Sequence, residues 1–386
     1  MATTEIASTN NMFGLQLFKT IFEENKDKNT FLSPFSISVA LAMTQLGARG
    51  KTASDMSATL QWNANSEQAI HDGYQSYISK LQQPCDKYQL STANRIFIEK
   101  NYPVLAEFIE KTKKFYLAEP VSADFGGDSE KERTNINSWV SEQTQNKIND
   151  LLPRGAVDAL TRMVLVNAIY FKGKWDEEFN PNLTRPLPFK VSPSNTKDVP
   201  MMFAKRKFAF FQDESLACTA IEIPYKGKDL GMVVILPNDD FGLEALVKTL
   251  TPEKLTGLLG RLGKPFQEVK LTLPKFEVSS RFQLKPLLSA LGMAEAFNVQ
   301  NADFSGMTEG EKRDLVLDEV YHNAFVKVNE EGTEAAAATA MSMTLGCAPV
   351  TTIVSLVVDH PFLFAIFDKR ANGNMIFLGQ VVDPSV

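Results

Sequence analysis

The second half of the chain consists largely of short apolar runs, and this pattern constrains the fold more than any other feature. The runs begin near residue 162 with RMVLVNAIYF and recur up to MIFLGQVV near the end. They are rich in β-branched and aromatic residues and are bounded by turn-forming residues, which is typical of strands. Helical periodicity is found mainly in the first third, as in NMFGLQLFKTIFEEN. The two kinds of segment do not alternate regularly, so we expect an α+β fold.

Further helices are predicted within the first third and between the strands. Residues 33–50 begin with a Ser-Pro cap and end at Gly, and residues 134–152 have Thr134 as a candidate cap and end before Pro153. The other helical candidates are residues 68–83, 242–260 and 284–293. No linker or repeat divides the 386 residues, so we expect one domain spanning 1–386.

Composition excludes several classes of function. A net charge of -6 argues against nucleic acid as a partner, and no apolar run reaches the roughly 20 residues that span a bilayer. The first residues lack the basic and apolar regions of a secretory signal. The three cysteines are widely spaced and fit a reducing compartment, with neither a disulfide framework nor a metal site. We expect a cytoplasmic protein; nuclear or extracellular placement, or secretion after loss of a signal peptide, stays open.

Catalytic motifs fail on spacing. The segment GARGKT ends like a phosphate-binding loop, but the position that requires the first Gly is Gln45. The chain has only three histidines and no G-x-S-x-G elbow. We interpret His71 as part of a polar helix face and His360 as part of a turn that enters a strand. The sequence therefore predicts no catalytic residue, no cofactor and no metal, and hence no enzyme.

The segment GTEAAAATAMSMTLGCAP, residues 332–349, belongs to a connection longer than twenty residues. Connections of that length inside a compact domain are usually functional or disordered. Its Ala run favours a surface helix by propensity, but it lacks an apolar face at helical spacing. Read as a strand, Thr333, Ala335, Ala337, Thr339, Met341, Met343 and Leu345 share one uncharged face. The other face, which could contact water, is made of Glu334, Ala336, Ala338, Ala340, Ser342 and Thr344. The segment is therefore expected to be able to join a sheet.

Several motifs, taken in order, resemble the serpin family over residues 10–384, in its ovalbumin-like intracellular clade. They are FLSPFSIS, LVNAIYFKGKW, IEIPYKGKDLGMVVILP, LPKFEV, ADFSGM, LDEVYHNAFVKVNEEGTEAAAATA, DHPFLFAIFD and MIFLGQVVDP. The resemblance implies three β-sheets, about nine helices and an exposed reactive-centre loop at about residues 331–356. In that family a target protease cleaves the loop, becomes acyl-linked to it, and is distorted when the loop inserts into the main sheet.

The resemblance also implies roles for individual residues. Glu330 would end the strand that leads into the loop, with Lys275 as its ion-pair partner and Trp175 packed nearby where the sheet first opens. A polar cluster would lie beneath the centre of the sheet. The hinge residues are Gly332, Thr333, Ala335, Ala336, Ala337 and Ala338, and the polar cluster is Ser33, Ser36, Asn167 and His322.

The cleaved bond is expected at Gly346-Cys347, with Leu345-Gly346 and Cys347-Ala348 left open. No Lys or Arg occurs from residue 331 through 368, which disfavours a trypsin-like protease. An elastase-like or chymotrypsin-like serine protease and a papain-like cysteine protease both remain candidates.

The alternative function is that of a non-inhibitory serpin that binds, chaperones or stores. Charge, Pro or bulk at the inward-facing hinge positions would favour it, and Thr333, Ala335 and Ala337 show none. A monomer is expected, with loop-insertion polymers or dimers linked through Cys347 as open alternatives. Activation by heparin is not expected, because residues 61–84 carry only Lys80 as a basic residue.

Overall fold

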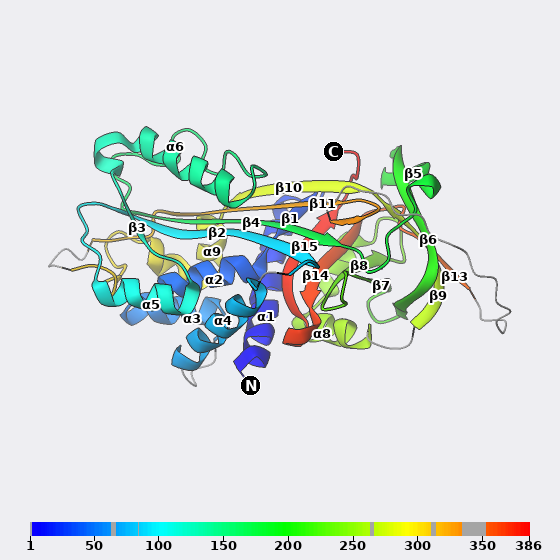
Figure 1. Cartoon of the computed structure of the whole chain (residues 1–386), viewed down its shortest axis with the longest axis horizontal. Helices are drawn as coiled ribbons and strands as arrows, with labels where there is room; N and C mark the ends of the chain where they lie inside the picture. Colours follow the sequence, from blue (N-terminus) through cyan, green and yellow to red (C-terminus); the bar gives the residue numbers. More distant parts are fainter. Residues whose placement is uncertain (1, 63–66, 84, 263–265, 310–313, 334–352) are drawn as a thin grey trace.

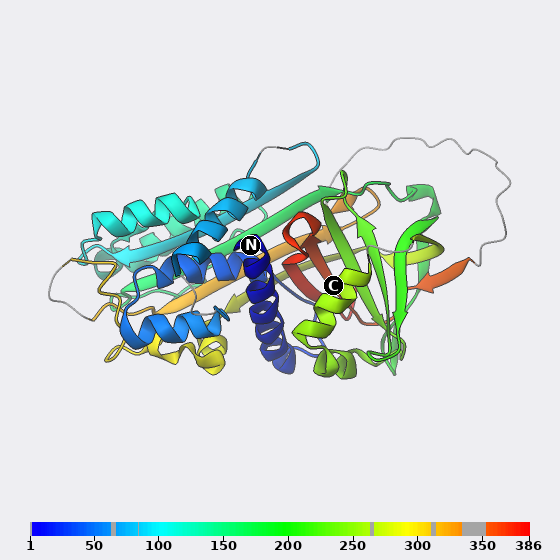
Figure 2. The ribbon, with the colours of Figure 1, turned by 90° about the horizontal axis from the view of Figure 1, so that it is seen from below.

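The computed structural model describes residues 2–62, 67–83, 85–262, 266–309, 314–333 and 353–386. A six-stranded sheet lies along the molecule, with helices beneath one half of it and a nine-stranded sheet beneath the other half (Figure 1). Seen from below, most of the helices lie at one end of the molecule and the strands of the nine-stranded sheet at the other, with α1 (Ala2–Glu24) between them (Figure 2). The predicted α+β class is confirmed.

The six-stranded sheet has the order β10-β11-β12-β4-β2-β3. Its long strands β4 and β11 run parallel and pair directly from Val164 with Glu319 to Tyr170 with Phe325. Beyond that stretch the short β12 lies between them. The strand bounds are β2 Tyr88–Glu99, β3 Val121–Ala123, β4 Met163–Lys174, β10 Phe276–Gln283, β11 Glu319–Val328 and β12 Gly332–Thr333.

The nine-stranded sheet has two parts that share β6. The first residues of β6 pair with β5, its middle residues pair with β9, and its last residues pair with β7. The three expected sheets are thus the six-stranded sheet and these two parts, which are continuous through one long strand. The bounds are β1 Thr30–Leu32, β5 Arg185–Ser192, β6 Asn195–Asp213, β7 Cys218–Pro224, β8 Leu230–Pro237, β9 Phe266–Pro274, β13 Val354–Val357, β14 Phe362–Asp368 and β15 Asn374–Val381.

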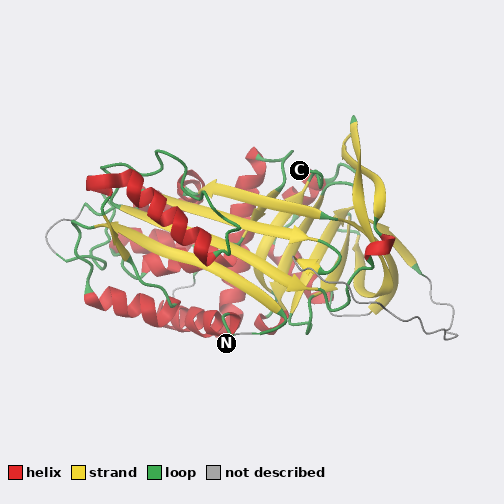
Figure 3. Cartoon of the chain, turned by 45° about the horizontal axis from the view of Figure 1, so that its top comes forward, coloured by secondary structure: helices red, strands yellow, loops and turns green. Residues whose placement is uncertain are grey.

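Nine α-helices occur in the part of the chain that the structure describes, and none of them is long and apolar enough to cross a membrane. Figure 3 shows α6 crossing the outer face of the six-stranded sheet. The bounds are α1 Ala2–Glu24, α2 Pro34–Gln45, α3 Gly50–Thr59, α4 Glu67–Leu81, α5 Ala106–Tyr116, α6 Phe125–Gln143, α7 Leu243–Thr249, α8 Pro252–Arg261 and α9 Lys285–Leu288.

Several predicted boundaries were wrong. Helix α6 begins after Asp124, whose side chain accepts a hydrogen bond from the Gly127 amide, so Thr134 is not its cap. Instead the Thr134 hydroxyl donates within the helix to the Glu130 carbonyl, and the helix ends at Gln143, well before Pro153. Residues 242–260 form two helices because Thr251 caps a new helix that starts at Pro252. Helices α3 and α5 and strand β2 were not predicted.

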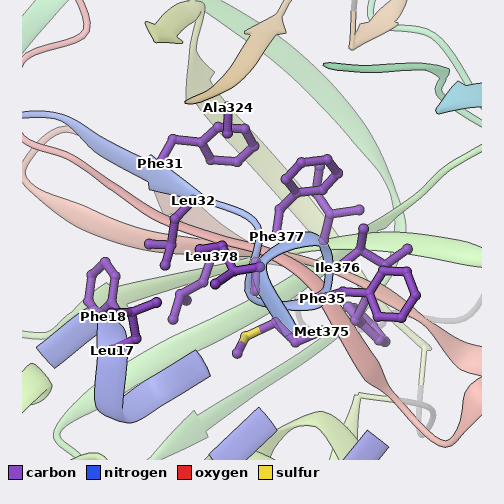
Figure 4. Close-up of a cluster of buried hydrophobic side chains, with 14 of the residues drawn as sticks. Leu17, Phe18, Phe31, Leu32, Phe35, Ala324, Met375, Ile376, Phe377 and Leu378 are labelled. Atoms are coloured by element: carbon purple, nitrogen blue, oxygen red, sulfur yellow. The ribbon is translucent and has the colours of Figure 1, made fainter. Parts of the chain in front are cut away.

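The main core lies between the two sheets and the helices beneath them. The Phe31 ring stacks between Phe377 and Phe364, with centroids 5.0 and 5.5 Å away, as part of the cluster in Figure 4. A second apolar cluster fills the space between α6 and the outer face of β4, and includes Val166 and Tyr170. Strand β4 is therefore packed on both faces, which explains its nearly continuous apolar sequence.

Gly379 leaves room for this core, and we expect Gly379→Ala to destabilise the fold. A Cβ atom at this position would lie 2.6 Å from the Thr30 carbonyl oxygen and 2.9 Å from the Phe364 ring. Overpacking of this kind costs about 1–3 kcal/mol of unfolding free energy, measurable by urea denaturation. The control is Gly257→Ala in α8, where the added atom meets nothing within 4 Å. It should instead stabilise by about 0.5–1 kcal/mol. Equal effects at both positions would contradict the prediction.

Candidate functional site

The site lies where β4 and β11 separate to admit β12. Thr333 pairs with Val328 of β11 on one side and with Gly173 of β4 on the other. Gly332 pairs with Lys174. Both residues of β12 are buried. Gly332 and Thr333, the first two residues of the predicted hinge, therefore lie in the sheet at the end where its central strands diverge.

Gly332 is required by the backbone geometry of this entry. Its φ is +152°, and a Cβ atom would lie 2.0 Å from the carbonyl oxygen of Gly173. A side chain at this position would be strained and would also clash with β4. The preceding turn is held by Asn329, whose side-chain oxygen accepts hydrogen bonds from the amides of Glu331 and Gly332 at 3.1 and 3.2 Å. Together these features direct the chain from β11 back into the sheet.

Thr333 is held from below by an aromatic pair. Its hydroxyl lies 2.8 Å from the Tyr225 hydroxyl, and both residues are fully buried. Trp175 stacks on Tyr225 with centroids 4.7 Å apart, and its indole N–H donates to the Asn329 carbonyl at 2.9 Å. Burial raises the pKa of Tyr225 well above its usual range, so its hydroxyl stays protonated. Tyr225 thus contacts both Trp175 and Thr333 and connects them directly.

An ion pair anchors the start of the turn. Lys275 Nζ lies 2.9 Å from Glu330 Oε2, and the Thr184 hydroxyl donates to Glu330 Oε1 at 2.7 Å. The structure thus has the ion pair expected between Lys275 and Glu330. Burial alone would raise the pKa of Glu330, but the hydrogen bonds from Lys275 and Thr184 outweigh it and lower that pKa. Glu330 is therefore a buried, paired carboxylate at neutral pH.

A row of three polar side chains crosses the sheet further down, where β4 and β11 pair directly. Asn94 of β2, Asn167 of β4 and His322 of β11 occupy matching register positions. Asn167 Nδ2 donates to Asn94 Oδ1, and His322 Nδ1 lies 2.5 Å from Asn167 Oδ1. Because the Ser33 amide donates to His322 Nε2, the histidine proton belongs on Nδ1. Burial lowers the pKa of His322 to about 3, so the ring is neutral.

The two serines expected in this cluster connect the polar row to α2. The Ser33 hydroxyl donates to the Ile376 carbonyl at 2.7 Å and caps α2 by accepting from the Ser36 amide. Asn167 Nδ2 also donates to Ser36 Oγ at 2.7 Å. Separating β4 from β11 would break the bond between Asn167 and His322, leaving buried polar groups without partners unless something replaces it.

Several residues at this site were missed from the sequence. Tyr225 lies in the quoted motif IEIPYKGKD, but nothing in the local pattern indicates a partner more than a hundred residues away. Asn94 could have been found only by aligning β2 with β4, and β2 itself was not predicted. Gly173 acts through backbone geometry and Asn329 through hydrogen bonds to the turn that follows it, and composition reveals neither. The predicted Ala335 to Ala338, Leu345, Gly346 and Cys347 lie outside the described residues.

The two other histidines differ in how well they were predicted. His71 is buried rather than on a polar face, with Nδ1 2.5 Å from the Tyr116 hydroxyl, because α5 packs against α4. Burial lowers its pKa to about 4. His360 lies in the expected turn and contacts the Pro237 carbonyl at 2.9 Å. It lies close to Asp240 and Asp359 in an arrangement that could hold a metal ion. The Lys190 ammonium is already 2.8 Å from Asp240 Oδ2 and 3.6 Å from Asp359 Oδ2.

Comparison with known proteins identifies the family. The family model described as Serpin (serine protease inhibitor) matches residues 8–384. The chain belongs to the serpin family. Serpin B6 from Macaca fascicularis is 42% identical over 98% of this chain and 99% of that protein. Leukocyte elastase inhibitor from Bos taurus is 43% identical over 98% and 100%. The crystal structure of human thyroxine-binding globulin with its ligand superposes with a TM-score of 0.89 at 31% identity, covering both chains fully.

These comparisons confirm the resemblance and the fold inferred from the motifs. The serpin relatives that match over the whole chain are the kind expected for the ovalbumin-like clade. Within the serpin fold, β12 lies where β4 and β11 separate. The polar row crosses the same two strands further down, where they pair directly. The junction of β4 and β11 is thus the candidate functional centre of this serpin.

We expect Tyr225→Phe to loosen the entry of β12 into the serpin sheet. The substitution leaves the buried Thr333 hydroxyl without its partner, at a cost of about 1–3 kcal/mol. Amide hydrogen exchange of residues 332–333, followed by mass spectrometry, should become faster. In the double variant Tyr225→Phe with Thr333→Val both partners are apolar, so protection should largely return. Unchanged exchange in the single variant would contradict the role given to this hydrogen bond.

We expect His322 to make the stability of this serpin dependent on pH. Its folded pKa of about 3 lies below the usual histidine pKa of 6.5, so only the unfolded chain is protonated between these values. The unfolding free energy therefore falls as the pH is lowered through this window. Near pH 5, His322→Gln should reduce the slope of unfolding free energy against pH by about 1.4 kcal/mol per unit.

Urea denaturation at several pH values measures this slope. The matched control is Asn167→Ala, which removes the hydrogen-bond partner but keeps the buried imidazole. It should lower stability at every pH and leave the slope nearly unchanged. The prediction is wrong if His322→Gln and the parent protein have the same slope.

Proposed function

We propose that this serpin inhibits proteases as a suicide substrate whose cleaved loop becomes a new strand between β4 and β11. The observation that carries this proposal is the position of β12 at the open end of the sheet, where Thr333 pairs with both β11 and β4 and Gly332 pairs with β4. The expected chemistry is acyl transfer. The nucleophile of the protease attacks the Gly346 carbonyl, the bond to Cys347 breaks, the freed amine takes up a proton, and an acyl-enzyme forms.

Continuing the observed antiparallel register assigns partners to the inserted loop. Thr333 opposite Gly173 and Val328 implies that Thr339 would arrive opposite Asn167 and His322. A threonine hydroxyl would thus enter the polar row at the point where strand separation breaks it. This supports insertion, because the buried groups of Asn167 and His322 would regain a partner rather than remain unsatisfied.

The same register gives the two faces of the inserted strand different surroundings. The face of Ala337 and Met341 would lie with Ile169 and Leu165, which belong to the core between the sheets. The other face, which was expected from the sequence to contact water, would lie over the apolar cluster beneath α6. Small Ala side chains suit that covered position.

Insertion would also replace one ladder of backbone hydrogen bonds between strands with two such ladders. The direct parallel pairing of β4 with β11, from Glu319 to Phe325, would be lost. Two antiparallel ladders would replace it, one on each side of the new strand. Antiparallel pairing is slightly more stable per residue than parallel pairing, so the exchange favours the inserted form.

The target protease is proposed from the loop sequence. The absence of Lys and Arg from residue 331 through 368 favours an elastase-like or chymotrypsin-like serine protease, or a papain-like cysteine protease. The name of the similar leukocyte elastase inhibitor supports the elastase-like choice. If the cleaved bond is Gly346-Cys347, a papain-like protease would read Leu345, one residue before Gly346, and an elastase-like protease would accept the small Gly346. If the bond is Leu345-Gly346, an elastase-like or chymotrypsin-like protease would read Leu345 directly. The widely spaced cysteines support the cytoplasm as the compartment of this serpin.

The alternative function is that of a binding protein without inhibition. Its support is the structural likeness to thyroxine-binding globulin. The inward-facing positions of the hinge weigh against it, because Thr333 and the alanines that follow carry neither charge nor bulk. Inhibition is therefore the better-supported proposal.

The decisive experiment incubates the protein with pancreatic elastase, chymotrypsin and papain separately, followed by denaturing electrophoresis. We expect at least one protease to form a covalent adduct that survives SDS, and the cleaved serpin to unfold at a higher temperature than the intact one. Mass spectrometry of the released C-terminal peptide identifies the bond; cleavage at Gly346-Cys347 releases residues 347–386. Cleavage without adduct and without a rise in thermal stability would overturn the inhibitor proposal.

Thr333→Arg tests insertion with the loop still cleavable. An arginine here would place an unpaired charge against Tyr225 in a fully buried position, which is costly. We expect the variant to be cleaved as a substrate, with a loss of adduct of tenfold or more. The control Thr333→Ser keeps the hydroxyl and should retain inhibition. Full inhibition by Thr333→Arg would contradict the model.

A further inference from the structure

Two connections that are far apart in the sequence meet at β5. Asp240 lies in the connection that follows β8, whereas Asp359 and His360 lie between β13 and β14. The Lys190 amide of β5 donates to the Asp359 carbonyl at 2.7 Å. One side-chain ligand atom from each of Asp240, Asp359 and His360 lies within 4.8 Å of the other two. No motif in the sequence indicates this cluster, because only the packing of β5 against both connections creates it.

His360 contributes an imidazole nitrogen to the cluster from a buried position. The residue is 5% exposed, and its Nε2 lies 2.9 Å from the Pro237 carbonyl oxygen. Because a carbonyl can only accept, this contact places a ring proton on Nε2 and leaves Nδ1 for another partner. A histidine that binds a metal ion through one nitrogen usually donates from the other nitrogen in this way. The ring is therefore held in the orientation and tautomer of a ligand that binds through Nδ1.

The partners of Nδ1 are two carboxylates. Nδ1 lies 2.9 Å from Asp359 Oδ1 and 3.6 Å from Asp240 Oδ1. Within the residues that the structure describes, no N–H or O–H group donates to this nitrogen. A lone pair on Nδ1 and two carboxylate oxygens repel one another unless a cation, which is either a proton or a metal ion, lies between them. The cluster thus requires positive charge at its centre.

The spacing of the three atoms favours a metal ion over a proton. Zn²⁺ binds histidine nitrogen and carboxylate oxygen at about 2.0–2.1 Å in a tetrahedron, so neighbouring ligand atoms lie about 3.3–3.4 Å apart. The two distances from Nδ1 bracket this value. A proton on Nδ1 would form a hydrogen bond to Asp359 only, because 3.6 Å to Asp240 is too long for one. A zinc ion would contact both carboxylates at once.

Lys190 leaves the centre of the cluster free. Its Nζ contacts the second oxygen of each carboxylate, at 2.8 Å from Asp240 Oδ2 and 3.6 Å from Asp359 Oδ2. Two carboxylates and one ammonium leave a net charge of -1, which attracts a divalent cation. The Asp240 side chain is 42% exposed, so an ion can enter from solvent.

We propose that this serpin binds one zinc ion through Asp240 Oδ1, Asp359 Oδ1 and His360 Nδ1. Three protein ligands with water in the fourth position is an arrangement that zinc adopts in proteins. The ion would join the connection between β13 and β14 to the connection that follows β8. Among the described strands, β13 pairs only with β9. Zinc would therefore fasten the segment that follows the expected reactive-centre loop, and the proposal does not depend on protease inhibition.

Zinc chloride is the probe, titrated by calorimetry into the intact protein after treatment with a chelator. We expect one saturable site and a rise in unfolding temperature with occupancy. His360→Gln removes the nitrogen ligand while its amide can still donate to Pro237, and Asp240→Asn removes a charged ligand. Each should weaken zinc binding by about tenfold or more. The matched control Asp239→Asn neutralises the exposed neighbouring carboxylate and should leave the affinity unchanged.

Lys190→Met should change the zinc affinity in the opposite direction. It removes the ammonium that competes for the two carboxylates but keeps the backbone amide that donates to Asp359. We expect zinc to bind about threefold tighter or more. Lys190→Arg keeps the positive charge and should bind zinc like the parent protein. A purely structural role of Lys190 would not strengthen zinc binding.

Cobalt distinguishes this site from zinc binding at a thiol such as the exposed Cys85. Thiolate ligands give bound Co²⁺ an intense charge-transfer absorption that nitrogen and oxygen ligands lack. We expect cobalt to bind without this absorption, and His360→Gln to abolish the cobalt spectrum. A thiolate spectrum, equal zinc affinity in the parent protein and His360→Gln, or weaker binding in Lys190→Met would overturn the proposal. Absence of saturable zinc binding would do the same, because a proton alone would then supply the positive charge.

Discussion

The direct pairing of β4 with β11 is the interaction on which the rest of the structure depends. The two strands run parallel through the centre of the main sheet, and only at one end does β12 separate them. Asn167 and His322 join them with a buried hydrogen bond at the middle of the paired stretch. A hydrogen bond in an apolar core is costly to break, because both polar groups are then left without a partner. It therefore opposes the separation of β4 from β11.

At the open end of the sheet, the residues are instead arranged to hold β12 between β4 and β11. Gly332 turns the chain into the sheet in a conformation that only glycine adopts easily, and Gly173 leaves space for the Tyr225 ring beside it. The Tyr225 hydroxyl satisfies the buried hydroxyl of Thr333. In the proposed insertion, continuing the register from this point would bring Thr339 to the polar row. The backbone pairing of β12 would thus determine which loop side chain meets the buried histidine.

Sequence patterns predicted the long apolar elements well and the irregular ones poorly. Strand β4 was recognised because burial on both faces leaves it nearly continuous in apolar residues. Strand β2 was missed because Thr92, Asn94 and Arg95 interrupt its apolar residues. Its outer edge faces helices and a cavity rather than a further strand along most of its length. The start of α6 was misplaced because Thr134 is also a residue type that caps helices, whereas in the structure the cap is Asp124, directly after β3.

The sequence by itself determined the fold class, the family and a loop whose side chains alternate in a way that a sheet can accept. These follow from local periodicity and from motifs that remain recognisable along the chain. Only the tertiary structure decided which residues work together. Asn94, Asn167 and His322 are separated by many residues but become neighbours through strand register, and Tyr225 meets Thr333 only once two sheets are packed. Such contacts depend on long-range pairing, to which local composition is insensitive.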